Sequence, residues 1–203
     1  MQPKTKIQTQ TRARVRAADK PAARIVSLFL PRFATDRLNR VRPGSARPHP
    51  DPSAPQVTAL KDGGALRVAA VNGAAEGAGV VPGLALADAR ALVPDLHAFP
   101  ANPDHDARAL TRLAAWCGRY TPWTAPEADA GAGEAGAGIW LDVSGCAHLF
   151  GGESALLDDL VGRLGGLGFS ARAAVAETPG AAWAMARFGM VPGTRTTRIA
   201  PGE

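Results

Sequence analysis

Residues 139–152, which read IWLDVSGCAHLFGG, decide the fold of this chain. Ile139, Trp140 and Leu141 predict a short apolar strand, because β-branched and aromatic residues favour extended backbone. Asp142 and the residues after it, Val-Ser-Gly, end that strand with turn-forming chemistry. The stretch therefore predicts a strand that leads directly into a turn.

The rest of the chain alternates between apolar strand patterns and helical patterns. Further strands are predicted over 24–30, 66–71, 96–99 and 170–175, and helices over 73–78, 84–93, 103–118, 154–164 and 179–187. The helix over 103–118 is the clearest, because Leu110, Leu113, Ala114 and Cys117 share one face. Residues 41–57 read as a loop, and the low-complexity run 125–138 reads as a loop with little chance of packing. This order predicts an α/β or α+β sheet with packed helices.

Composition and length limit the class of protein. A chain of 203 residues can bury a core and form one domain or slightly more. It has no run of 18 apolar residues and no apolar core of a secretory signal, so we expect no membrane contact. The only two cysteines, Cys117 and Cys146, make no disulfide framework and read as reduced thiols. These features predict a cytoplasmic protein.

Positive charge is concentrated in the first quarter of the chain. Residues 1–50 carry twelve Lys and Arg against two acids, a balance of +10, whereas residues 51–203 carry eleven against sixteen, a balance of −5. Residues 1–23 are basic and non-periodic, which predicts a disordered leader. Two interpretations of this leader remain open: a solvated segment, or a segment that binds DNA phosphates. The candidate nucleic-acid-binding residues are Lys4, Lys6, Arg12, Arg14 and Arg16.

Five segments, in order, carry a resemblance to a known family. They are RIVSLFLPRFATDRL (24–38), AAEGAGVVPGLALADARALVPDL (74–96), LAAWCGRYTPW (113–123), IWLDVSGCAHLFGG (139–152) and AVAETPGAAWAMARFG (174–189). Together they resemble the first half of Y-family DNA polymerases, specifically the ImuB-type proteins of bacterial mutagenesis cassettes. The resemblance implies a palm sheet with packed helices over 24–190 and a small helical fingers-like insertion near 60–100. Residues 191–203 are expected to be a C-terminal tail, with thumb and little finger absent.

The resemblance also implies where catalytic carboxylates would stand. Active relatives end the first strand with a metal-binding Asp and place an Asp-Glu pair directly before the LDVTG-like strand. Polymerase chemistry needs these acids to hold two metal ions. Here residues 28–32 contain no acid, and the pair is replaced by Ala137 and Gly138. Asp142 matches the Asp of the turn, outside the metal pair, and reads as a turn or strand-end residue.

The side chains that grip the triphosphate in active relatives are missing as well. The resemblance places a Tyr and an Arg, three residues apart, where this chain has Gly73 and Glu76, and a later Lys where it has Ala181. Glu76 would repel a phosphate by the same Coulomb interaction that Arg uses to attract it. We therefore predict no catalytic residue, no cofactor-binding residue, no metal ligand and no cofactor.

The resemblance implies a non-catalytic accessory protein in DNA repair, acting in damage-induced (SOS) translesion synthesis. Implied partners are DNA, an error-prone replicative-type polymerase, a RecA-like protein and the sliding clamp. Two alternatives stay open: an active, magnesium-dependent error-prone translesion polymerase, and a truncated fragment without function. A nucleic-acid-binding module that works through the basic leader is a third interpretation.

Other motifs are weaker. The run 73–79 has the wrong spacing for a dinucleotide-binding loop. Cys146 with His148, and residues 104–106 (DHD), lack a second ligand pair at zinc-site spacing. No GxSxG elbow for a hydrolase occurs. The four tryptophans, Trp116, Trp123, Trp140 and Trp183, read as core or interface anchors.

Overall fold

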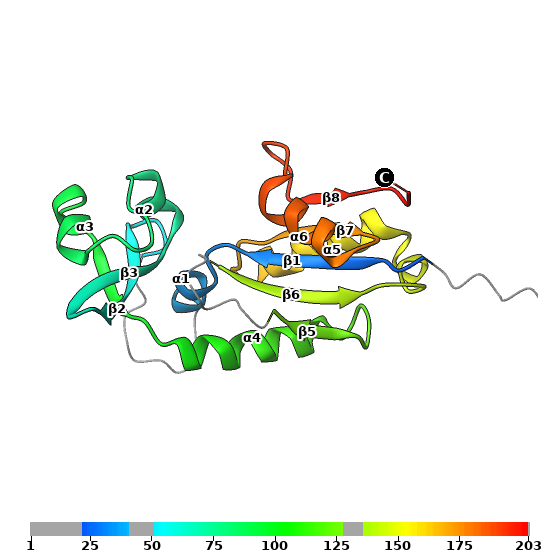
Figure 1. Ribbon diagram of the computed structural model, residues 1–203, viewed down its shortest axis with the longest axis horizontal. Helices are drawn as coiled ribbons and strands as arrows, with labels where there is room; N and C mark the ends of the chain where they lie inside the picture. Colours follow the sequence, from blue (N-terminus) through cyan, green and yellow to red (C-terminus); the bar gives the residue numbers. More distant parts are fainter. Residues whose placement is uncertain (1–21, 41–50, 128–135, 203) are drawn as a thin grey trace, which may run out of the picture.

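The computed structural model describes residues 22–40, 51–127 and 136–202, which form a five-stranded sheet, a three-stranded sheet and the helices around them (Figure 1). The larger sheet has the order β5-β6-β1-β7-β8. Its strands are β1 (Ile25–Leu30), β5 (Thr124–Pro126), β6 (Ala137–Asp142), β7 (Arg172–Ala176) and β8 (Thr196–Arg198). The central strand β1 is antiparallel to both β6 and β7, while β8 adds in parallel to β7.

Three longer helices pack on this sheet: α4 (Pro103–Cys117), α5 (Glu153–Gly166) and α6 (Pro179–Phe188). Each of α4 and α6 begins with a proline at its first position and a side-chain cap before it. The Asn102 side chain accepts a hydrogen bond from the His105 amide at 3.0 Å, and Thr178 Oγ1 accepts one from the Ala181 amide at 3.3 Å. These caps explain why both helices start where the sequence predicts.

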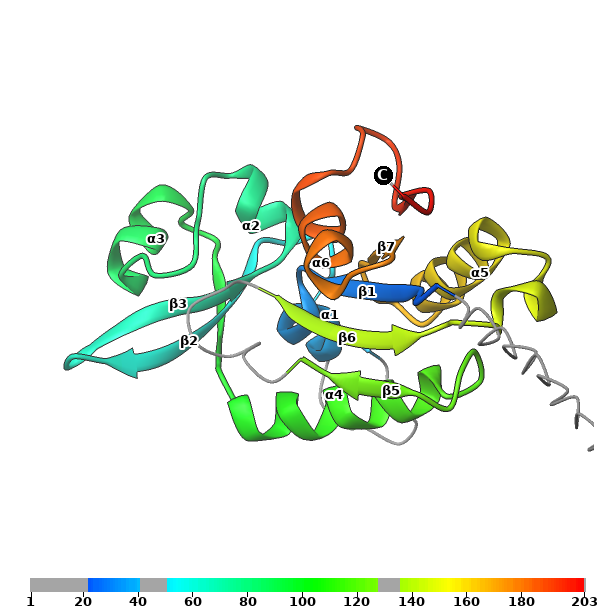
Figure 2. The same ribbon diagram turned by 45° about the vertical axis from the view of Figure 1, so that its right-hand side comes forward.

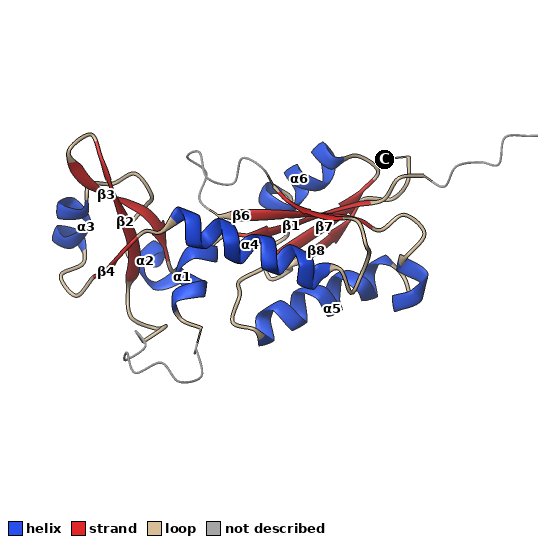
Figure 3. Cartoon of the chain, turned by 90° about the horizontal axis from the view of Figure 1, so that it is seen from below, coloured by secondary structure: helices blue, strands red, loops and turns tan. Residues whose placement is uncertain are grey.

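The two faces of the sheet are covered by different helices (Figure 3). Because strand side chains alternate, Val26, Leu28 and Leu30 share a face and pack with the leucines of α4 and α5 in the main core. Phe29 points to the opposite face, where it packs with Ala186 of α6. We call this second side the α6 face.

The smaller sheet has the order β3-β2-β4, with β2 (Gln56–Asp62), β3 (Ala65–Val71) and β4 (His97–Pro100). Helices α2 (Gly73–Gly77) and α3 (Leu86–Leu92) cover it and bury a separate core. The short helix α1 (Phe33–Leu38) joins the two sheets. The β2–β3 hairpin extends away from the larger sheet (Figure 2).

Several sequence-based expectations need correction. In the segment near 60–100 the strands predicted over 66–71 and 96–99 are present as β3 and β4, but β2 between them was not predicted. The expected loop 41–57 ends in β2, because Gln56 and Val57 are fully buried between β3 and β4. The expected loop 125–138 contributes residues to β5 and β6 within its described part. The expected tail 191–203 contains β8. The strands β5 and β8 are too short to be recognised from periodicity. They form because the edges of β6 and β7 supply their backbone hydrogen-bond partners.

Cys117 and Cys146 are free thiols, as the sequence predicts. Burial beneath the sheet raises the pKa of Cys117 to about 12, which keeps this thiol protonated and unreactive.

Within the described ranges, no helix has both the length and the apolar character needed to cross a bilayer.

Candidate functional site

The residues that would carry polymerase chemistry meet at one end of the β1–β6 pair. In the antiparallel register, Phe29 lies opposite Gly138 and Leu30 lies opposite Ala137. The acid-free end of the first strand and the acid-free pair are therefore neighbours, as the family resemblance implies. We call this the palm-edge site.

The two positions of the missing pair face opposite sides of the sheet. Ala137 packs with Leu30 in the main core and is 5% exposed. Gly138 shares the α6 face with Phe29, because directly opposed residues in a ladder point to the same side. Only position 138 could present a side chain to the α6 face.

The carboxylate of Glu127 fills the space that a side chain at position 138 would take. A Cβ atom added to Gly138 would overlap Glu127 Oε2 and lie 2.9 Å from its Cδ and 3.1 Å from its Cβ. Glu127 is held in place by its own amide, which donates to the Gly138 carbonyl at 2.9 Å. Sequence reasoning missed Glu127, because it lies in a run of Ala, Gly and acids that reads as low-complexity loop.

Arg187 on α6 neutralises Glu127. Its Nη2 donates to Glu127 Oε2 at 2.6 Å, and the side chains are only 6% and 16% exposed. The guanidinium also lies 4.4 Å from the ring centroids of both Phe29 and Trp183, a cation–π arrangement. A paired, buried carboxylate of this kind is poorly suited to bind a metal ion.

A second ion pair stands where the resemblance places the triphosphate grip. Arg32, at the start of α1, donates from Nη2 to Glu76 Oε2 of α2 at 2.5 Å. Its guanidinium carbon would lie 3.3 Å from a Cβ at Gly73. The charge of Glu76 is thus engaged by Arg32, so the repulsive role expected of Glu76 is reduced. The pair is half exposed and contributes little to stability.

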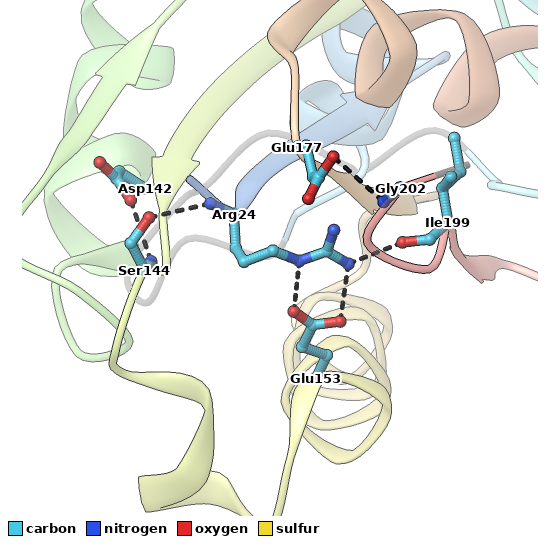
Figure 4. Close-up of polar contacts among 7 residues, drawn as sticks. All are labelled: Arg24, Asp142, Ser144, Glu153, Glu177, Ile199 and Gly202. Carbon is cyan, nitrogen blue, oxygen red and sulfur yellow. Dashed lines mark hydrogen bonds and ion pairs between the residues drawn. The ribbon is translucent and has the colours of Figure 1, made fainter. Parts of the chain in front are cut away.

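Asp142 lies at the opposite end of β6 from the palm-edge site. Its Oδ1 accepts a hydrogen bond from the Ser144 amide at 2.9 Å, and Ser144 Oγ accepts one from the Arg24 amide at 2.8 Å (Figure 4). Asp142 is thus a strand-end residue that orders the turn. It does not converge with Ala137 and Gly138.

Other candidates are not brought together. Ala181 lies in the first turn of α6 and has no side-chain chemistry. Across the described residues, no cluster of three or more His, Cys, Asp or Glu could hold a metal. None of the four tryptophans is fully buried, and Trp123 is 72% exposed, so of the two expected roles only an interface role stays open for Trp123, as a prediction. Lys4, Lys6, Arg12, Arg14 and Arg16 lie outside the described residues.

Solved structures with similar folds are DNA polymerases. The insertion ternary complex of Dbh DNA polymerase aligns with a TM-score of 0.62 at 14% identity, covering 88% of this chain and 49% of that one. DinB from Sulfolobus solfataricus aligns with a TM-score of 0.59 at 16% identity, covering 88% and 48%. The fold is therefore that of the palm and fingers of Y-family DNA polymerases.

The sequence comparisons narrow this class. The model of the impB/mucB/samB family matches residues 53–187, and the chain belongs to that family. Protein ImuB of Caulobacter vibrioides, strain NA1000 / CB15N, is 47% identical over 127 residues, which cover 60% of this chain and 26% of that protein. The same protein from strain ATCC 19089 / CIP 103742 / CB 15 matches equally. The chain thus spans about a quarter of the length of these relatives.

Y-family polymerase chemistry implies divalent metal ions, and the palm-edge residues do not fit them. Of the described side chains named at this site, only Glu127 offers a carboxylate, and Arg187 already binds it. Catalysis by two metal ions needs several carboxylates that converge with free oxygens. No catalytic step through a metal follows from this arrangement.

Proposed function

We propose that this protein is a non-catalytic, ImuB-type polymerase-like accessory protein in damage-induced translesion synthesis. The observation that carries the proposal is the palm-edge site, where Glu127 paired with Arg187 fills the place of a catalytic side chain at Gly138. The Arg32–Glu76 pair, which replaces the implied triphosphate grip, supports it independently.

The charge of these two places differs from that of a polymerase active site. Phosphoryl transfer needs a negative site that collects metal ions and a positive site that holds phosphates. In this chain each place contains a paired cation and anion, and Arg172 adds a further cation beside Phe29 and Arg187, so neither place carries the net negative charge that collects metal ions. We infer that the polymerase-like body has lost its chemistry and kept its shape, which suits a role in binding.

The domain division and the partners belong to this proposal. We assign the palm to the larger sheet and its helices, the fingers-like insertion to the region near 60–100, and the tail to 191–203. DNA is the partner that the polymerase relatives support. The error-prone replicative-type polymerase, RecA-like protein and sliding clamp rest on the family resemblance alone.

Calorimetry tests the absence of catalysis directly. We expect titration of the full chain with magnesium and a deoxynucleoside triphosphate to give no metal-dependent heat, because the described part of the chain holds no cluster of free carboxylates to bind the metal. A primer-extension assay under the same conditions should show no added nucleotides. Tight metal-dependent nucleotide binding, or extension that is lost on chelation, would support the active-polymerase alternative.

The basic leader is proposed to contribute electrostatic affinity for DNA. Deletion of residues 1–23 removes six Lys and Arg, including Lys4, Lys6, Arg12, Arg14 and Arg16. We expect weaker binding to duplex DNA and a flatter dependence of log affinity on log salt, since each phosphate contact contributes about −0.9 to that slope. An unchanged affinity and slope in a salt titration by fluorescence anisotropy would refute a role of the leader.

A further inference from the structure

Helix α1 is fixed to the palm, the larger sheet with its helices. Phe33 packs in the main core. Arg37 forms a largely buried ion pair with Asp106 of α4. Asp36 accepts a hydrogen bond at 2.7 Å from the amide of Ser170, just before β7. Because these links reach three separate parts of the palm, we expect α1 to move together with it.

The contact of α1 with the smaller sheet is polar. α1 lies against β2 and β3 (Figures 1 and 3). Val57 and Ala59 of β2 point into the separate core of the smaller sheet, so Gln56 and Thr58 point to the other side, because strand side chains alternate. Gln56 and Thr58 are nevertheless buried, at 0% and 2% exposed. Polar side chains thus lie where a rigid junction would bury apolar ones.

Two buried polar atoms at this contact lack a hydrogen-bond partner. Over residues 22–40, 51–127 and 136–202 these atoms are Gln56 Oε1 and Thr58 Oγ1. The Gln56 amide nitrogen is satisfied, since Nε2 donates to the Asp51 carbonyl. A buried polar atom without a partner is disfavoured relative to the same atom in water. If the smaller sheet moved away from α1, water would reach both atoms and remove this cost.

Two side-chain links oppose such a movement in the described part of the chain. The first is the Arg32–Glu76 pair, which connects the start of α1 with α2, and its side chains are 34% and 56% exposed. The second is a hydrogen bond at 3.2 Å that the buried Thr35 Oγ1 donates to the Val71 carbonyl. Solvent and salt weaken an exposed ion pair, so the first link is easily broken.

Open space lies beside the contact. A cleft of about 560 Å³ is lined by Arg32 and Asp36 of the α1 region, by Asn72 and Gly73 at the start of α2, and by Gly168 after α5, among others. The walls of the cleft therefore come from both sides of the contact. A change of angle between the palm and the smaller sheet alters this space without unpacking either core.

We propose that residues 51–100, which we call the fingers-like unit, turn about α1 as one body. The Arg32–Glu76 pair is the latch of the closed arrangement described above. Opening hydrates Gln56 and Thr58 and widens the cleft. Ionic strength sets the balance between the open and closed arrangements, since salt screens the exposed latch. This movement does not depend on whether the palm-edge site is catalytic.

The distance between two spin labels on the full chain, measured by double electron–electron resonance, tests the proposal. One label is attached at Ala87→Cys in α3 and the other at Ser154→Cys in α5, both exposed positions. Cys146→Ser removes the partly exposed thiol, and burial protects Cys117 from labelling. We expect an open and a closed population, with the open share rising between about 0.05 M and about 0.5 M salt.

Glu76→Gln tests the latch. We expect it to raise the ratio of open to closed molecules about two- to fivefold at low salt, the effect of losing an exposed ion pair, and to remove most of the salt dependence. Asp62→Asn is the matched control, because Asp62 pairs with Arg67 inside the fingers-like unit, with side chains 67% and 46% exposed. This control should leave the distances unchanged.

Two buried threonines separate a moving joint from a general loss of stability. Thr58→Val removes the hydroxyl that lacks a partner, so we expect fewer open molecules. Thr35→Val removes the donor to the Val71 carbonyl, so we expect more. Circular dichroism of each labelled chain checks that the distances come from folded protein. A single distance that neither salt nor Glu76→Gln changes would overturn the proposal, as would equal responses to the two threonine variants.

Discussion

Replacement of Gly138 by alanine is expected to lower the free energy of unfolding by about 3–5 kcal/mol, the usual effect of breaking a buried ion pair. The added methyl group would overlap Glu127 Oε2 and crowd its Cδ and Cβ. Moving Glu127 Oε2 out of this space breaks its present hydrogen bond from Arg187 Nη2, and the Arg187 side chain is only 6% exposed. Chemical denaturation of both proteins measures the loss as a shift of the denaturation midpoint, provided that the slope of unfolding free energy against denaturant concentration is the same for both.

Two matched variants show whether Glu127 is the cause. Gly162→Ala, in the exposed middle of α5 with nothing within 4 Å of the new Cβ, should stabilise by about 0.5–1 kcal/mol. In a Glu127→Ala/Arg187→Met background, Gly138→Ala should cost far less, because both partners of the pair are already gone. The interpretation fails if Gly138→Ala costs as much in that background as in the original chain.

The space occupied by Glu127 also limits which side chains position 138 can carry. A carboxylate introduced at position 138 would have to displace the Glu127 side chain, which fills that volume. Gly138→Glu would add a second carboxylate beside the first, and like charges at that distance repel. A single acidic substitution at position 138 would therefore disturb the Glu127–Arg187 pair, which accords with the proposed accessory role.

The second large effect is expected for Arg24→Met, at about 3–5 kcal/mol of lost unfolding free energy. Arg24 donates to Glu153 from Nε at 2.6 Å and from Nη2 at 2.8 Å, and Nη2 also donates to the Ile199 carbonyl at 2.7 Å (Figure 4). The side chains of Arg24 and Glu153 are 9% and 18% exposed. Removing the guanidinium leaves the Glu153 charge largely buried and without this partner.

Arg163→Met is the matched control for Arg24→Met. Arg163 also forms an ion pair from α5, with Asp159 one turn away, but the side chains are 54% and 39% exposed. Solvent screens such a pair, so thermal denaturation should change little. Hydrogen exchange gives a second readout: Arg24→Met should speed exchange of the Ile199 amide, which donates to the Val175 carbonyl beside β8. Equal losses of stability in the two variants would contradict a special role for Arg24.

Much of the fold was predictable from local sequence pattern. The strands near 25–30 and 139–142 are apolar runs interrupted only by Ser27 and ended by Asp142. The helices over 103–117 and 179–188 have a proline start, a polar cap and one apolar face. Such signals depend on neighbours within a few residues. The family resemblance added the expectation that positions 137 and 138 correspond to the catalytic acid pair of active relatives. Hydrophobic periodicity alone does not provide this.

Tertiary structure decided the rest. Through the family resemblance, the sequence predicted that Ala137, Gly138, Gly73 and Glu76 stand where active relatives carry metal-binding or phosphate-binding side chains. Only the folded chain pairs Glu127 with Arg187, 60 positions apart, and Arg32 with Glu76, 44 positions apart. Such pairs leave no periodic trace, because they depend on where β5, α1, α2 and α6 pack. The sequence therefore determined which groups are missing, and packing decided which groups occupy their places.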